Sequence, residues 1–193
     1  MKIIKPYFLI GEVIKGTEML KRIEDSGRAC YQSSHAITED SHLKFIKMII
    51  TNGHESVLEH EKITVRFICD RGVSHELVRH RLASFSQEST RFCNYSKDPF
   101  GKELTFIKPS FWQFKEDRIK YRTWLEAMSL AEKVYLLLIE FGASPQEARS
   151  VLPNSLKTEL VVTANLREWR LILKQRTSVK AHPQMRELMV PLL

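Results

Sequence analysis

The sequence has little cysteine and lacks the common glycine-rich nucleotide motifs. Its three cysteines, Cys30, Cys69 and Cys93, are widely spaced and form no C-x-x-C pair, which argues against a disulfide framework and a zinc knuckle. Neither G-x-G-x-x-G nor G-x-x-x-x-G-K-[ST] occurs. Because the cysteines show no pairing pattern, we expect a reducing, cytoplasmic setting. Any bound phosphate has to be held by arginine side chains, hydroxyls and helix N-termini.

Long hydrophobic runs are also missing. The first residues are apolar only in short pieces, interrupted by Lys5, Pro6 and Glu12, which argues against a signal peptide or a membrane span. The length of 193 residues, with 43% hydrophobic and 27% charged residues, favours a single globular domain over residues 1–193. The formal charge of +7 indicates either an anionic partner or only a margin of solubility.

The hydrophobic periodicity predicts an α+β domain in which strands and helices follow in mixed order. The expected strands are residues 3–10, 61–70, 104–108 and 156–165. The expected helices are residues 17–31, 39–53, 75–82, 111–141 and 166–176, with a last helix opening at His182 and Pro183. Ser74 should cap the 75–82 helix after a turn at residues 71–72, so that residues 79–91 run from its last turn into a loop. Ser144 and Glu147 predict a capping box for another short helix.

Metal and nucleophile motifs are incomplete. His75 and His80 are five residues apart, which places them about 140° apart around a helix, so they could not share one zinc ion. His54 and His60, six residues apart, meet the same difficulty. No G-x-S-x-G elbow surrounds the serines at 84, 86 and 89. We expect no metal and no covalent catalysis by the protein.

Arginines are concentrated in RHRLASFSQESTR, residues 79–91, and recur at Arg149, Arg167, Arg170 and Arg176. A solvated basic face is the simplest explanation for such a cluster. However, guanidinium groups mixed with Ser, Gln and Glu suit a small phosphorylated nucleotide, because they can bind its phosphate, sugar and base edges. Nucleic acid fits less well, since its binding tracks favour longer Lys-rich stripes with exposed aromatics.

The same segment carries a family signature, in which Arg79, His80 and Arg81 are followed after seven residues by Ser89. This pattern resembles the signature of the flavin-dependent thymidylate synthases. The similarity covers nearly the whole chain, with GRACYQS, HESVLEH, ARSVLP and TANLREW in family order. The resemblance implies a twisted, largely antiparallel sheet surrounded by helices, and a homotetramer whose subunits share the FAD pockets.

An activity is implied as well. A member of this family methylates dUMP to dTMP, taking a methylene group from methylenetetrahydrofolate and a hydride from reduced FAD, which NADPH regenerates. The expected partners are therefore dUMP and folate, with neither nucleic acid nor membrane. The alternatives are a relative that modifies another pyrimidine nucleotide and a basic nucleic-acid-binding module without catalysis.

The resemblance assigns the site residue by residue. FAD would contact His54, Ser56, Arg79, His80, Arg81, Leu82, Gln87, Asn165, Leu166, Arg167 and Leu171. The substrate dUMP would be bound by Glu76, Arg79, Gln87, Glu88, Ser89, Thr90, Arg91, Arg149 and Arg176. Arg176 would also be catalytic, because a fixed guanidinium stabilises negative charge on the pyrimidine; the alternative is a cation that only complements a helix dipole. Ser89 would bind dUMP without attacking it. Leu171 stands where relatives can carry an Asn, and either Lys180 or His182 would take the part of a His that approaches the cofactor.

Overall fold

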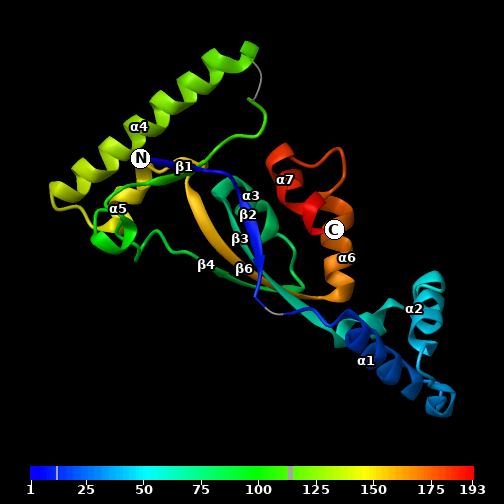
Figure 1. The fold of residues 1–193 in the computed structure, drawn as a ribbon. Coiled ribbons are helices and arrows are strands. Elements are labelled where there is room, and N and C mark those ends of the chain that lie inside the picture. Colours follow the sequence, from blue (N-terminus) through cyan, green and yellow to red (C-terminus); the bar gives the residue numbers. More distant parts are fainter. Residues whose placement is uncertain (12, 113–114) are drawn as a thin grey trace.

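The computed structural model, which describes residues 1–11, 13–112 and 115–193, shows a four-stranded antiparallel sheet with helices around it (Figure 1). The strand order is β2 (Tyr7–Ile10), β3 (Lys62–Asp70), β6 (Lys157–Asn165) and β4 (Ala83–Gln87). A separate parallel pair joins β1 (Lys2–Ile4) to β5 (Thr105–Ile107). The predicted mixture of helices with a largely antiparallel sheet is confirmed.

Alternating side chains give the two central strands different faces. β3 and β6 pair over their full length, from Lys62 opposite Asn165 to Asp70 opposite Lys157. One face is buried, and its residues are Val65, Phe67, Cys69, Leu160, Val162 and Ala164. The other face is mixed: Thr64 and Thr163 share a hydrogen bond of 2.8 Å and Arg66 pairs with Glu159, while Ile68 is buried. The apolar face is therefore the one that forms a core with helices.

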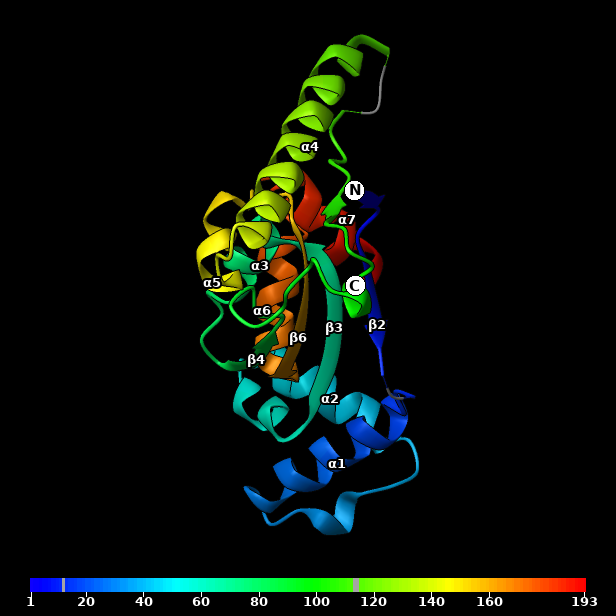
Figure 2. The same cartoon turned by 90° about the vertical axis from the view of Figure 1, so that its left-hand side faces the viewer.

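The helices gather in three places. They are α1 (Gly16–Ala29), α2 (Ser41–Thr51), α3 (Arg71–Leu77), α4 (Arg118–Glu140), α5 (Pro145–Ala148), α6 (Leu166–Arg176) and α7 (Pro183–Leu192). Helices α3, α6 and α7 share a core with the buried face of the sheet and lie behind the strands in Figure 2. Helices α1 and α2 pack together at one end of the molecule, and α4 extends from the other. No helix in the described part of the chain is long and apolar enough to span a bilayer.

The first predicted strand is split. Instead of one strand over residues 3–10, β1 ends at Ile4 and β2 begins at Tyr7, and the two pair with different strands. Pro6 lies between them. Because proline has no backbone N–H to donate, it interrupts a ladder and allows the chain to change partners.

The structure also corrects the region of the arginine-rich segment. Helix α3 begins at Arg71, where a turn was predicted, and ends at Leu77, so residues 79–82 are not helical. Asp70, and not Ser74, is the N-cap, because its Oδ1 accepts a hydrogen bond of 2.9 Å from Val73 N. Residues 83–87, predicted as a loop, form the edge strand β4 against β6. The start of the helix was predicted too late because β3 runs directly into α3 without a separate turn.

Most of the other predicted strands and helices are present. The strands at 61–70, 104–108 and 156–165 and the helices at 17–31, 39–53 and 166–176 are confirmed within a few residues. Ser144 and Glu147 form the capping box of α5, and His182 precedes α7 as its N-cap. The long helix begins at Arg118, later than the predicted residue 111; residues 113–114 of that prediction lie outside the described residues.

Asp70 holds two elements together, and its removal should measurably destabilise the fold. Its Oδ2 accepts a hydrogen bond of 3.0 Å from Gln184 Nε2 on α7, while Oδ1 caps α3. For Asp70→Ala we expect a loss of about 2–4 kcal/mol, from the lost cap and the unpaired buried amide of Gln184. Urea unfolding measures this loss. Asp70→Asn keeps the capping oxygen and should lose less; an equal loss in both variants would contradict the capping role.

Candidate active site

A buried histidine forms the centre of the site. His80 follows α3, and its Nε2 accepts a hydrogen bond of 3.0 Å from Nε of Arg176. Its Nδ1 lies 3.3 Å from Oε1 of Glu168 on α6. Because a guanidinium only donates, Nε2 has to be the unprotonated nitrogen. The tautomer assigned by this network is neutral, with the Nδ1 proton donated to Glu168.

The electrostatics agree with the neutral tautomer. Burial lowers the pKa of His80 below its ordinary value of 6.5, and the positive charge of Arg176 lowers this pKa further, while Glu168 opposes the shift. His80 is therefore uncharged at neutral pH. An uncharged acceptor orients the guanidinium of Arg176 without neutralising it.

Arg176 is held from two directions. It is the last residue of α6, and besides His80 it binds Glu76 twice, with 2.7 Å from Nη1 to Oε2 and 2.9 Å from Nη2 to the backbone oxygen. Its side chain is only 19% exposed. A cation that only complemented the helix dipole would not need these contacts, which fix the plane of the guanidinium. The predicted residues Glu76, His80 and Arg176 thus lie together.

A cavity of about 710 Å³ lies beside this group, along α6. Its lining includes Leu82, Asn165, Arg167, Glu168, Leu171 and Lys174. Four of these were predicted as cofactor residues. Leu82 precedes β6 in the sequence, Asn165 is the last residue of β6, and Arg167 and Leu171 follow it. Leu82 is 68% and Leu171 43% exposed, so the cavity offers apolar surface next to guanidinium and ammonium groups. This combination suits a ligand with a flat ring system and phosphates, and FAD has both.

Glu168 is a candidate site residue that the sequence prediction missed. It is 4% exposed, lines the cavity and binds His80, so it connects the two parts of the site. A signal was present in the sequence. Glu168 stands four residues before Ile172 and directly before Trp169, on the stripe of α6 that faces the core. A carboxylate on a buried stripe needs a partner, and His80 is that partner.

The other predicted cofactor residues surround the start of α6. Asn165 caps this helix, since its Oδ1 accepts a hydrogen bond of 2.8 Å from Glu168 N. Leu166 packs against the core of α1 and α2, and Arg167 pairs with Glu59 at 2.6 Å. His54 is exposed, with Nδ1 3.2 Å from the hydroxyl of Tyr31. The exposed Ser56 is next to Glu55, a lining residue of the cavity, whereas Arg79 and Arg81 are exposed and make no ion pair among the described residues.

The predicted substrate residues at the end of β4 and just after it form a second group. Gln87 donates to Ser74 Oγ at 2.8 Å and to Thr158 Oγ1 at 3.2 Å. Glu88 is held by Tyr95, whose hydroxyl donates at 2.7 Å, and by the ammonium of Lys157 at 2.8 Å. Both contacts fix the carboxylate before any ligand binds. Tyr95 and Lys157 were not predicted as site residues.

The turn that follows carries the rest of this group. Ser89 Oγ accepts a hydrogen bond of 3.3 Å from Arg91 N, which leaves its hydroxyl proton for another acceptor. Thr90 is buried and accepts a 3.5 Å hydrogen bond from Arg149, which directly follows α5. Arg91 is exposed, with its guanidinium 5.4 Å from the centre of the Phe92 ring.

One chain does not bring all predicted residues to one place. Among the described residues, no hydrogen bond or ion pair connects the Arg149 group with Arg176, and Figure 1 shows α5 and α6 on opposite sides of the sheet. Lys180 and His182 do not line the cavity; the ring of His182 contacts Phe111 at 5.9 Å instead. In the described parts of the chain, no three His, Cys, Asp or Glu side chains gather as metal ligands.

Comparison with known proteins identifies the family. The sequence profile of the thymidylate synthase complementing protein family matches residues 12–193. The chain belongs to this family. It is 35% identical over 157 residues to a flavin-dependent thymidylate synthase of Pyrococcus abyssi, which covers 81% of the chain and 63% of that relative.

Other relatives carry the same name. The chain is 39% identical over 140 residues to a flavin-dependent thymidylate synthase of Thermococcus kodakarensis, covering 72% of the chain and 56% of the relative. For the enzyme of Corynebacterium aurimucosum the identity is 34% over 189 residues, covering 89% of the chain and 73% of the relative. The chain thus spans less than two thirds of the Pyrococcus and Thermococcus relatives and about three quarters of the Corynebacterium one.

Proposed function

We propose that this family member is a flavin-dependent thymidylate synthase of the cytoplasm, formed by one domain over residues 1–193. It converts dUMP to dTMP, with methylenetetrahydrofolate as carbon donor and FAD, recharged by NADPH, as hydride donor. The observation that carries the proposal is the cavity at α6, where predicted cofactor residues lie beside the fixed Arg176. The names of the relatives support it. FAD, when bound, supplies the hydride, and the protein supplies position and electrostatics.

Arg176 has a defined task in this reaction. C5 of the uracil can attack the methylene carbon only when negative charge has built up on the ring. The new C5–carbon bond takes up that electron pair, and the C5 proton leaves afterwards. A guanidinium held by His80 and Glu76 is already oriented, so it can stabilise this charge without reorganising. Glu168 contributes by keeping His80 in its neutral tautomer. The remaining advantage comes from holding the reactants in one orientation.

The separation of the two residue groups supports shared active sites. We propose a homotetramer with the sheet-and-helix arrangement of the family, in which Thr90, Arg91 and Arg149 of one subunit complete the site of another. Exposed apolar residues occur close to both groups, with Leu82 68% and Phe92 79% exposed. Side chains of this kind gain most from burial against a second subunit.

The experiment that tests the proposed activity combines spectroscopy and isotope exchange. The purified protein should take up FAD and show its visible spectrum, and it should release the C5 hydrogen of dUMP to water. The same assay with dCMP is the control and should show no release. A protein that does not take up FAD would refute the enzyme, whereas exchange with dCMP instead of dUMP would assign a different pyrimidine nucleotide.

Arg91→Ala should weaken dUMP binding by about 1.5–3 kcal/mol, because a charge-assisted contact to the phosphate is lost. Arg91 is exposed, and in the described parts of the chain its guanidinium forms no ion pair and lies over the Phe92 ring, so the fold should keep its stability. Calorimetric titration with dUMP measures the effect. Arg122→Ala, an exposed arginine paired with Glu126 on α4, is the matched control and should bind like the parent. An unchanged dUMP affinity in Arg91→Ala would remove this residue from the site.

A further inference from the structure

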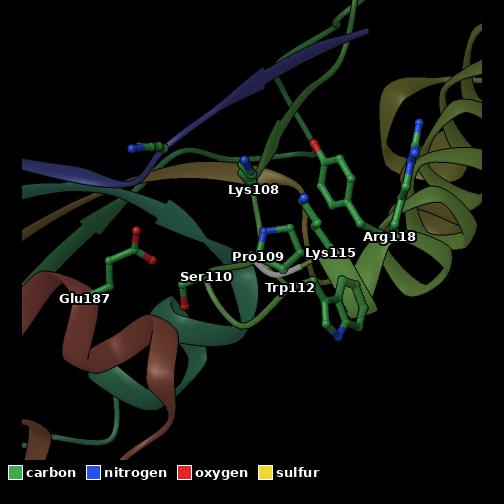
Figure 3. A pocket seen from close by; sticks show the side chains of 9 residues that line it. Lys108, Pro109, Ser110, Trp112, Lys115, Arg118 and Glu187 are labelled. Atoms are coloured by element: carbon green, nitrogen blue, oxygen red, sulfur yellow. The ribbon is translucent and has the colours of Figure 1, made fainter.

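A second cavity, of about 450 Å³, lies away from α6, where the chain between β1 and β2, the segment after β5, and α7 come together. Four cations line it, namely Lys5, Lys108, Lys115 and Arg118, against one carboxylate, Glu187. Figure 3 shows Lys108 and Lys115 between α7, which carries Glu187, and α4, which carries Arg118. The cations come from separate segments of the chain, so the fold, and not a local run of basic residues, assembles them.

These cations are not neutralised within the described chain. None of the four has a carboxylate oxygen within 4 Å among residues 1–11, 13–112 and 115–193. Lys108 is half-buried, and its Nζ lies 5.4 Å from the centre of the Tyr121 ring. That ring in turn stacks on Trp124 at 5.6 Å. Lys108 is therefore held in position, which distinguishes it from a solvated surface lysine.

Glu187 opposes an anion less than an ordinary carboxylate does. Burial raises the pKa of Glu187, while a hydrogen bond from Ser110 and the charge of Lys5 act in the other direction. Its Oε2 is buried and has no hydrogen-bond partner among the described residues. In the protonated form, this carboxyl group can donate a hydrogen bond to an anionic oxygen.

The start of α4 adds to the positive potential. Arg118 is the first residue of this 23-residue helix, and the N-cap residue Asp117 makes no side-chain capping hydrogen bond. A helix N-terminus carries partial positive charge and free backbone N–H groups, which favour phosphate. The guanidinium of Arg118 can bind two phosphate oxygens at once, and the lysines act as point charges beside it.

We propose that this cavity binds the di- or triphosphate group of a nucleotide, with the base against Trp112. An excess of three positive charges exceeds what one phosphate ester, with about −1.5 to −2 charges, would neutralise. The volume lies in the range of small-molecule sites, about 300–1,000 Å³. Trp112 is partly exposed at the cavity and offers a ring for stacking. The site does not depend on the proposed function, because it shares no residue with the cavity at α6.

Calorimetric titration with inorganic triphosphate and with ATP tests the site. We expect saturable binding of both, with ATP binding more tightly because of Trp112. Lys115→Ala and Arg118→Ala should each weaken both by about 10-fold or more, since each removes a charge-assisted contact. Both side chains are exposed, so neither change should affect folding. Trp112→Ala should weaken ATP only, and Glu187→Gln should tighten both.

Two controls separate this site from its alternatives. Arg122→Ala on the same helix and Arg149→Ala in the predicted dUMP site should both bind triphosphate like the parent. Absence of saturable binding would overturn the proposal, as would a loss of binding in Arg149→Ala but not in Arg118→Ala. Equal affinity for ATP and inorganic triphosphate would keep the phosphate site and overturn the base contact. Binding of a single-stranded oligonucleotide alone would indicate a nucleic-acid surface instead.

Discussion

Arg176→Ala should lower turnover by about 10²–10³-fold, the usual effect of removing one fixed group that stabilises charge in a transition state. FAD uptake should change much less, because the cavity lining does not include Arg176. Single-turnover conversion of dUMP measures the first effect, and the visible spectrum of the purified protein measures the second.

The control variants separate charge from geometry. Arg176→Lys keeps the charge but not the planar fork that binds Glu76 and His80, so it should recover only part of the activity. Arg122→Ala should behave like the parent. If FAD uptake falls as far as turnover does, Arg176 has a role in cofactor binding and not in the chemistry.

The fold could be predicted where one physical signal dominated. Apolar residues predicted β3, which buries Val65, Phe67 and Cys69 on one face, and β6, which buries every second residue from Thr158 to Ala164. Edge strand β4 was missed because its sequence, ASFSQ, contains little apolar surface, and its structure comes from pairing with β6, which a local pattern does not show. The cap at Asp70 was missed for a similar reason, since Ser74 has the right side chain and only the end of β3 decides between them.

The sequence named candidate site residues, but it did not show which of their side chains contact one another. The family signature contains His80, and the wider resemblance named Arg176, yet no spacing along the chain reveals that they are 3.0 Å apart. The partner carboxylate, Glu168, is 88 residues from His80 and becomes visible only when α6 packs beside the end of α3. The arrangement of subunits is even harder to predict from the sequence, because it depends on surfaces and not on local patterns.

Glu168→Leu should lower turnover by about 10–100-fold, as expected when the partner that orients a functional histidine is lost. The buried Nδ1 proton of His80 then has no acceptor, so stability should fall by about 1–3 kcal/mol. Glu168→Gln keeps an oxygen at this place and should recover most of both losses. Steady-state kinetics with dUMP and urea unfolding measure the two effects.

The pKa of His80 distinguishes a positioning role from a merely structural one. Glu168 raises this pKa and Arg176 lowers it, so the pKa should fall in Glu168→Leu and rise in Arg176→Ala, as followed by NMR titration of the imidazole. Since the folded pKa lies below the unfolded value, the contribution of His80 to stability is present above about pH 6.5 and is lost as the pH falls through the folded pKa. A variant that loses stability while turnover per folded molecule and the His80 pKa stay unchanged would show that Glu168 only supports the core. A kcat that falls while the KM for dUMP is retained, together with recovery in Glu168→Gln, would establish that Glu168 acts on Arg176 through His80.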